Sequence, residues 1–172
     1  TLISAALLLI VIVVGWSFTK YHGDRTKREI IKENEASITV LTVYLNAELR
    51  KVEGAVKSLA ASPLIAPALI TRNDIDIEHA NSVLERYNTA LDASICYLID
   101  KRGMTVASSN AGDPDSFVGK SYRFRPYFQE AIKGNNYSQF ALGVTSLRRG
   151  FFASCPVRDD KNAIVGVAVI KK

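Results

Sequence analysis

The chain has 172 residues, a formal net charge of +5, 48% hydrophobic residues and 23% charged residues. This length accommodates one ordinary domain with an appendage, and the composition excludes a disordered chain. Two cysteines exclude a disulfide-dense scaffold, and the cysteines and two histidines lie too far apart in the sequence to form a metal-ligand motif. The sequence begins without Met, and residues 164–172 have the pattern of a strand that runs to the last residue, so we expect a fragment of a longer protein.

The N-terminal segment is strongly apolar. Residues Leu2–Phe18 carry no charge, and at about 1.5 Å per residue they cover roughly 25 Å, close to the thickness of a bilayer core. Trp16 and Lys20 flank the end of the run, as at a membrane–water boundary. We expect a transmembrane helix over residues 1–19. The alternatives are a signal peptide, for which residues 17–21 make a poor cleavage site, and a buried core helix.

A long helix is predicted next, over about Arg25–Ala61, within a signalling segment of residues 20–62. It contains no proline, one glycine, and apolar residues at every seventh position, namely Ile31, Ile38, Leu45, Val52 and Leu59. A seven-residue repeat indicates a partner, either a second copy in a homodimer or the body of the same domain. Ser62-Pro63 is expected to end the helix, and Pro67 to prevent easy resumption.

Residues 63–172 are predicted to form an α+β domain. A helix is expected over Ile75–Leu91 after an Asn73-Asp74 cap, and a short helix over Pro126–Lys133, between Pro126 and Gly134. The hydrophobic pattern predicts five strands, at residues 94–99, 104–108, 137–145, 150–158 and 163–171. An antiparallel five-stranded sheet with flanking helices accounts for this order.

The sequence contains none of the common enzyme signatures, such as a P-loop, a dinucleotide-binding glycine motif or a nucleophile elbow. His22 and His79 have no triad partners, so no catalytic residue, metal or cofactor is expected in this segment. Cys96 and Cys155 fall on predicted strands, where buried free thiols are the more common state, although a pair remains open.

Charge is concentrated in one window. Residues 120–149 contain six basic residues and a single acid, Glu130, and they are rich in Tyr and Phe. The basic residues are Lys120, Arg123, Arg125, Lys133, Arg148 and Arg149. Such a window indicates a nucleic-acid surface, a solvated basic face or a pocket for a small anion. A membrane tether and the absence of a long basic stripe disfavour nucleic acid. The planar fork of Arg matches a carboxylate, and the hydroxyls of Thr145 and Ser146 add neutral donors.

The same window carries a resemblance. The segments SYRFRPYF at 121–128, ALGVTS at 141–146, RGFF at 149–152 and GVAVIK at 166–171 resemble a Cache sensor domain. More narrowly, they are similar to the periplasmic sensor of C4-dicarboxylate sensor histidine kinases. The resemblance is strong over residues 94–172 and extends loosely over the whole chain. It implies a PAS-like fold, anchored in the bacterial inner membrane and facing outward, followed in the family by a second lobe, a second span and a kinase.

The resemblance also implies a ligand site between the sheet and the 121–128 segment. It places Tyr122, Arg125 and Tyr127 on the helix side of the pocket, with Arg123 either contributing or facing solvent. Thr145 and Ser146 would be sheet-side donors. Lys171 would be a second cation, able with Arg125 to neutralise a short diacid. The extra positive charge of Leu147-Arg148-Arg149 is a departure that leaves the ligand open.

We therefore expect the sensor part of a two-component receptor that binds a small carboxylate, with a C4-dicarboxylate favoured. The first alternative is the same sensor on a chemoreceptor or diguanylate cyclase, with an amino acid or monocarboxylate as ligand. An amino-acid site requires an acid for the ammonium group, and Asp159 and Asp160 lie in a predicted turn. The second alternative is a dimerisation module without a ligand.

Overall fold

The computed structural model describes residues 2–172, including the side chains of residues 10–18, 20 and 35–172. The chain divides into two compact units, one ending at Ala47 and the other comprising Glu48–Lys172. The predicted transmembrane segment, residues 1–19, falls partly outside the described side chains, which omit residues 1–9 and 19. Within the described part, no helix is both long and apolar enough to cross a membrane.

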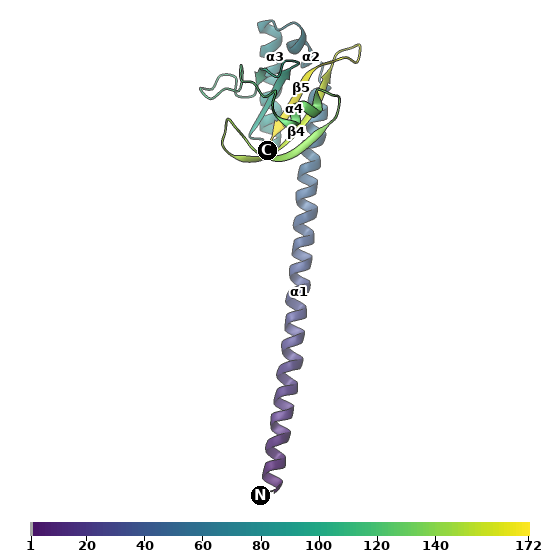
Figure 1. Ribbon diagram of the computed structural model, residues 1–172, viewed down its shortest axis with the longest axis vertical. Helices are drawn as coiled ribbons and strands as arrows, with labels where there is room; N and C mark the ends of the chain where they lie inside the picture. The colour runs from purple at the N-terminus through teal and green to yellow at the C-terminus, as the bar shows by residue number, and fades with distance from the viewer. Residues whose placement is uncertain (1) are drawn as a thin grey trace. The chain divides into compact units, whose positions relative to one another are not determined.

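Helix α1 spans Leu2–Ala60 (Figure 1) and therefore includes the predicted signalling segment almost to its end. The residues of the seven-residue repeat differ in burial along this helix. Val52 and Leu59 are buried in the core of the second unit, whereas Ile38 and Leu45 are 63% and 57% exposed; the side chain of Ile31 lies outside the described residues. The last turns of α1 thus pack within their own domain, whereas Ile38 and Leu45, the repeat residues of the earlier turns whose side chains are described, are exposed.

The second unit is the predicted α+β domain. Its elements (Figure 1) are α2 (Ala66–Ile70), α3 (Asp74–Leu91), β1 (Ile95–Asp100), β2 (Thr105–Ser108), α4 (Pro126–Ala131), β3 (Tyr137–Leu142), β4 (Arg149–Arg158) and β5 (Ile164–Lys171). The side chain of Asn73 accepts a hydrogen bond from the backbone N–H of Asp76 at 2.8 Å, which confirms the predicted cap of α3.

Several boundaries differ from the sequence-based expectation; α4, predicted to reach Lys133, ends at Ala131. Pro67 does not keep the chain from resuming a helix, because it occupies the first turn of α2, where a backbone N–H has no helical acceptor. Strand β3 ends at Leu142, not at 145. The following residues form a turn in which the N–H of Leu147 donates to the carbonyl of Gly143 at 2.9 Å, so Thr145 and Ser146 belong to a turn, not to the sheet.

The five strands form one antiparallel sheet in the order β2-β1-β5-β4-β3, as predicted. Because side chains alternate along a strand, the sheet has two distinct faces. On the helix face, Cys96 and Leu98 of β1 pack with α1, α2 and α3, in a cluster that includes Leu59 and Leu84. On the opposite face, which we call the pocket face, the neighbouring β1 residues pack with α4 and the loop before it, around Tyr127.

Both cysteines are buried free thiols. Cys96 lies on β1 and Cys155 on β4, and β5 separates these two strands in the sheet. Burial raises the pKa of the Cys96 thiol to about 12, which keeps it protonated and unreactive at neutral pH.

Candidate ligand-binding site

The pocket face contains a small cavity that brings together six of the seven predicted site residues. It is lined by Tyr97 of β1, Phe117 and Tyr122 of the loop before α4, Arg125, Tyr127 of α4, Phe152 of β4, Lys171 of β5, and the turn residues Gly143, Val144, Thr145 and Ser146. Five parts of the chain therefore line one cavity, and none of these described lining residues is acidic.

The position of Arg125 follows from the proline after it. Arg125 is the N-cap of α4 and has an extended backbone (φ −79°, ψ 134°), the conformation that a following proline favours. Its guanidinium carbon lies 5.3 Å from the ring centroid of Tyr127 and 5.4 Å from that of Phe152. Nη2 donates to the carbonyl of Leu142 at 3.1 Å. The buried Nε has no hydrogen-bond partner among the described residues, so a donor remains available to an anion.

Lys171 supplies the second cation. It pairs directly with Phe152 across β5 and β4, and its Nζ lies 5.6 Å from the centroid of that ring. The residue is only 2% exposed. Its ammonium donates to Ser146 Oγ at 2.6 Å and to the carbonyl of Arg148 at 3.1 Å. Burial, and secondarily the charge of Arg148, lowers the pKa of Lys171, as expected for a cation whose described partners are all neutral.

The tyrosines supply neutral hydroxyls and aromatic walls. Tyr122 Oη and Thr145 Oγ1 are 2.7 Å apart, and Tyr97 Oη donates to Tyr127 Oη at 2.7 Å. Burial raises the pKa of Tyr127 to about 12, so the phenol stays protonated at neutral pH. Aromatic walls exclude water, which strengthens a charge-assisted contact made between them.

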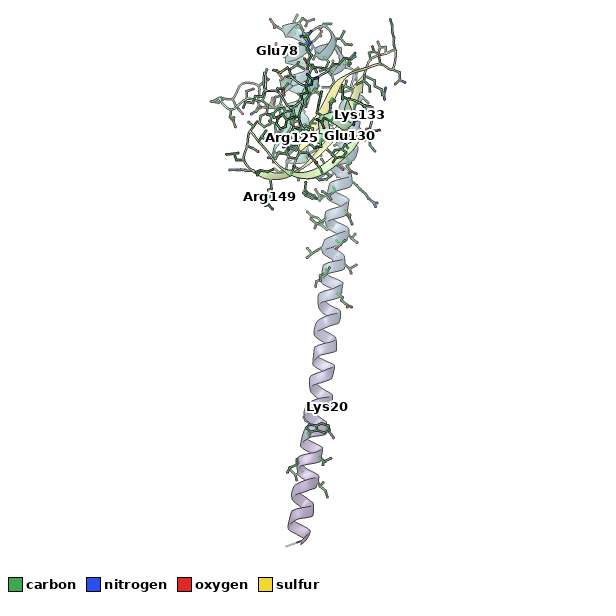
Figure 2. All side chains as sticks on the ribbon, in the orientation of Figure 1. Lys20, Glu78, Arg125, Glu130, Lys133 and Arg149 are labelled. Atoms are coloured by element: carbon green, nitrogen blue, oxygen red, sulfur yellow. The ribbon has the colours of Figure 1, made fainter. Side chains whose placement is uncertain are left out.

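Arg123 is the one predicted site residue that the structure does not bring to this cavity. It is exposed and lines a shallow surface depression with Lys101, Phe124 and Lys133. Conversely, Tyr97, Phe117 and Phe152 line the cavity without having been predicted. For Tyr97 a signal existed, because it alternates with Ile95 and Ile99 on a buried strand and so shares their face. Figure 2 shows Arg125 among the packed side chains of this unit and Arg149 at its margin.

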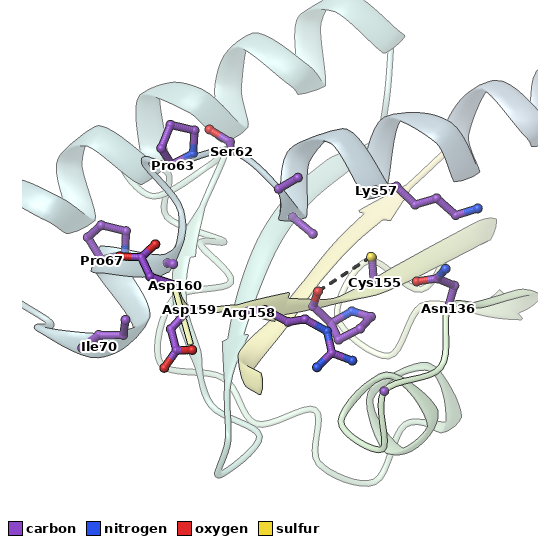
Figure 3. Close-up of a pocket in the computed structure, with 15 residues that line it drawn as sticks. Lys57, Ser62, Pro63, Pro67, Ile70, Asn136, Cys155, Arg158, Asp159 and Asp160 are labelled. Atoms are coloured by element: carbon purple, nitrogen blue, oxygen red, sulfur yellow. Dashed lines mark hydrogen bonds between the residues drawn. The ribbon is translucent and has the colours of Figure 1, made fainter. Parts of the chain in front are cut away.

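A second, larger depression lies beside the helix face. It measures about 760 Å³ and is bounded by the end of α1, by α2 and by the last part of β4. Figure 3 shows Lys57 and Arg158 around it, with Cys155 Sγ 3.8 Å from the Pro156 carbonyl. Two acids, Asp159 and Asp160, offset these two cations. The larger depression therefore has no net preference for an anion, whereas the described residues that line the cavity on the pocket face include two cations and no acid.

The five-stranded antiparallel sheet with helices on both faces confirms the α+β fold predicted from the sequence. The comparisons with known proteins agree. The chain is 29% identical over 172 residues to the C4-dicarboxylate transport sensor protein DctB of Pseudomonas aeruginosa and 30% identical over 171 residues to that of Rhizobium meliloti, covering 99% of this chain in each case. It spans only 28% and 27% of the length of these relatives. No protein-family model matches the chain.

Among solved structures, the sensor domain of the Vibrio cholerae histidine kinase DctB matches with a TM-score of 0.77 and 32% identity, over 84% of this chain and 56% of that one. The Escherichia coli DcuS sensor domain matches with a TM-score of 0.59 and 17% identity, covering 73% and 88% of the two chains. A Campylobacter jejuni chemoreceptor Tlp3 domain in complex with L-valine has a TM-score of 0.57 and 17% identity over 77% and 54%. The resemblance predicted from the sequence is confirmed: the chain is related to the C4-dicarboxylate sensor proteins and has a Cache-like sensor fold.

Proposed function

We propose that this chain is the extracytoplasmic ligand-sensing part of a membrane-bound sensor histidine kinase of a two-component system. The ligand is a small carboxylate, with a C4-dicarboxylate favoured. The observation that carries the proposal is the pair of cations, Arg125 and Lys171, that lie against the ring of Phe152. No acid is among the described residues that line this cavity.

The spacing of the cations suits a short diacid. Since their charged groups lie 5.4 and 5.6 Å from the same ring centroid, they are at most 11.0 Å apart. A four-carbon diacid holds its carboxyl carbons about 4 Å apart, and each contact with a cation adds about 3 Å. Such a molecule spans cations up to roughly 10 Å apart, which covers most of the range that the 11.0 Å limit allows, so a diacid with one carboxylate at each cation is compatible with this limit.

The rest of the proposal concerns the domain organisation. We assign residues 1–19 to a transmembrane helix, residues 20–62 to a signalling helix and residues 63–172 to the sensor lobe, with further domains beyond this segment. The apolar run at the N-terminus supports the span. The exposed side chains of Ile38, Leu41 and Leu45 support a homodimer through the helix. Ligand binding shifts the balance between two arrangements of sheet and helix, and the helix passes this shift across the membrane.

An amino acid is the main competing ligand, because a Tlp3 chemoreceptor domain solved with L-valine has a related fold. An amino acid requires a carboxylate for its ammonium group, and none of the described residues that line this cavity supplies one. A ligand without a positive charge is therefore favoured.

Thermal unfolding of the chain in the presence of small acids tests the proposal. The panel is succinate, malate, fumarate, malonate, acetate, lactate, pyruvate and several amino acids. A ligand at 100 times its dissociation constant stabilises the native state by about 2.7 kcal/mol, which shifts the midpoint by several degrees. We expect diacids to shift it and an Arg125→Ala variant not to respond. If amino acids alone act, the ligand class is wrong; if no acid acts on a folded sample, the dimerisation module becomes the better account.

A further inference from the structure

One short segment provides hydrogen-bond partners for three polar side chains of the cavity, those of Tyr122, Arg125 and Lys171. Residues 142–148 form the end of β3 and the turn that leads to β4. The carbonyl of Leu142 accepts from Arg125, the hydroxyl of Thr145 lies 2.7 Å from that of Tyr122, and Ser146 accepts from Lys171 at 2.6 Å. The carbonyl of Arg148 accepts a second bond from Lys171.

These bonds use some of the donors that a carboxylate ligand requires. A carboxylate offers only acceptors, and the groups that bind it must be donors. Arg125 and Lys171 already donate to oxygen atoms of the 142–148 segment. The segment therefore acts as an internal competitor for the cations of the site.

The volume of the cavity leads to the same conclusion. It encloses about 10 Å³, which is room for about one water molecule, whereas sites for small molecules measure roughly 300–1,000 Å³. Since a four-carbon diacid is several times larger than a water molecule, a wall must move before it enters. The walls formed by β1, β4 and β5 are central parts of the sheet and cannot move without breaking strand pairs.

The 142–148 segment is a wall that is only weakly attached to the sheet. Strand pairing stops at Leu142 and Arg149, and two backbone hydrogen bonds close the turn, Gly143 N–H to Arg148 and Leu147 N–H to Gly143. Leu147 is 76% exposed and has a φ of +50°, a left-handed conformation that is unfavourable for a leucine. Weakly attached, strained segments are the ones that open locally.

We infer that residues 142–148 form a latch that holds the site closed by hydrogen-bonding to its cations, and that the latch swings outward when a carboxylate takes these bonds. The inference rests on the proposed carboxylate site and adds its regulation: affinity is set by the stability of the latch as well as by the contacts with the ligand. A protein that must open before binding has an apparent affinity reduced by the fraction of open molecules.

Two glycine-to-alanine variants and one leucine variant test the latch. A Cβ at Gly143 would lie 2.5 Å from Ser146 Oγ and 3.1 Å from Lys171 Nζ, so Gly143→Ala disfavours the closed turn. Leu147→Asn acts in the opposite sense, because Asn tolerates the left-handed conformation and the side chain is exposed. Gly112→Ala is the matched control, since a Cβ there meets nothing within 4 Å.

The experiment measures succinate binding by calorimetry for the full chain in detergent, together with hydrogen exchange of the 143–148 amides without added acid. We expect Gly143→Ala to bind succinate about three- to tenfold more tightly than the wild type. Leu147→Asn should bind it more weakly, and Gly112→Ala should match the wild type. The amides of Gly143 and Leu147 should exchange much faster than those of the central strands. Weaker binding by Gly143→Ala combined with unchanged or tighter binding by Leu147→Asn would overturn the latch.

Failure of the latch and failure of the proposed function give different results. If the wild-type chain binds neither succinate nor any other acid of the panel, the proposed function fails. Hydrogen exchange of the 143–148 amides is then the measurement that tests whether the latch opens. Exchange at Gly143 and Leu147 as slow as in β4 would overturn the latch even when succinate binds, because the turn would then be a fixed wall.

Discussion

The two faces of the five-stranded sheet are built from different side chains. The helix face is aliphatic, with Val, Leu, Ile and Ala of α1, α2 and α3 packed against the strands. The pocket face carries most of the buried aromatic rings, among them Tyr97, Tyr127 and Phe152, together with two cations that no described carboxylate neutralises. The same strands contribute to both faces, so the difference lies in alternate residues of each strand and not in the fold.

This difference separates stability from binding. An aliphatic core gains free energy simply by excluding water. On the pocket face, a buried Arg125 Nε without a partner and the charge of a buried Lys171 are costs to folding. A ligand that accepts a hydrogen bond from Arg125 Nε and pairs with the Lys171 charge removes these costs, and their removal contributes to its affinity. Sites that bind ligands are often less stable for this reason.

The largest expected effect is on the helix face. Leu59 of α1 is fully buried, so Leu59→Ala should lower the free energy of unfolding by about 2–5 kcal/mol. Urea denaturation measures the loss. Calorimetry at a temperature where the variant is folded should show succinate affinity within twofold of the wild type. A large loss of affinity in the folded variant would mean that the two faces are not separable.

The pocket face should respond in the opposite way. Lys171→Met keeps the volume of the side chain but removes its charge. We expect succinate affinity to fall about 10- to 100-fold, the value of one hydrogen bond to a charged group. Because the buried ammonium has no described carboxylate partner, stability should stay level or rise by about 1 kcal/mol. Thermal unfolding and calorimetry on the same samples check both parts, and a variant that loses stability while it retains affinity would refute this assignment of Lys171.

A smaller effect is expected where β3 meets α1. Ser138 Oγ donates to Glu53 Oε1 at 2.5 Å, on the helix face and within the second unit. Ser138→Ala should lower the free energy of unfolding by about 1 kcal/mol and leave succinate affinity within twofold. Glu53→Gln, which retains an acceptor oxygen, should cost less. A several-fold change in affinity with Ser138→Ala would show that this bond couples the helix to the pocket.

The smallest effect is a dependence on pH. The pKa of Lys171 is lowered from 10.5 by burial and by Arg148. Between its folded pKa and 10.5, the unfolded chain binds a proton that the folded chain has released, so this residue makes stability rise with pH. Loss of the ammonium in the same range weakens succinate binding. Stability and affinity should therefore move in opposite directions as pH rises.

The contribution of Lys171 is isolated by subtraction. Burial raises the pKa of Cys96 and Tyr127, and these groups lower stability as pH rises above their ordinary values. Their effect cancels when the free energy of unfolding of Lys171→Met is subtracted from that of the wild type at each pH. A difference that falls with pH, or is flat between pH 8 and about 10.5, would contradict a lowered pKa for Lys171.

Much of the fold was predictable because its signals are local. Strand alternation and turn residues located all five strands, and the cap at Asn73 located the start of α3. Helix α2 was missed because a proline was taken as a barrier where it is an acceptable first-turn residue. The end of β3 was misplaced because Gly143 and Leu147 form a turn whose left-handed residue is a leucine, a choice that sequence patterns do not favour.

The site was predictable only in part because it depends on contacts between distant segments. Arg125 and Tyr127 could be placed together from one short motif, whereas the pairing of Lys171 with Phe152 depends on the register of β5 against β4. Arg123 has the same charge as Arg125 two residues away, yet it lies on the surface. Strand register decides the pairing of Lys171 with Phe152, and the direction of the loop decides the exposure of Arg123. Neither the register nor the loop direction can be obtained from composition.

The most direct test of the account is an NMR measurement of where the ligand lies. Isotope-edited NOEs between ¹³C-labelled succinate and the ring protons of Tyr122, Tyr127 and Phe152 would place it on the pocket face, between the two cations. We predict these NOEs in the wild type and their loss in Lys171→Met. NOEs instead to Ile70 and Pro67, which line the larger depression beside the helix face, would contradict the assignment of binding to the aromatic face of the sheet.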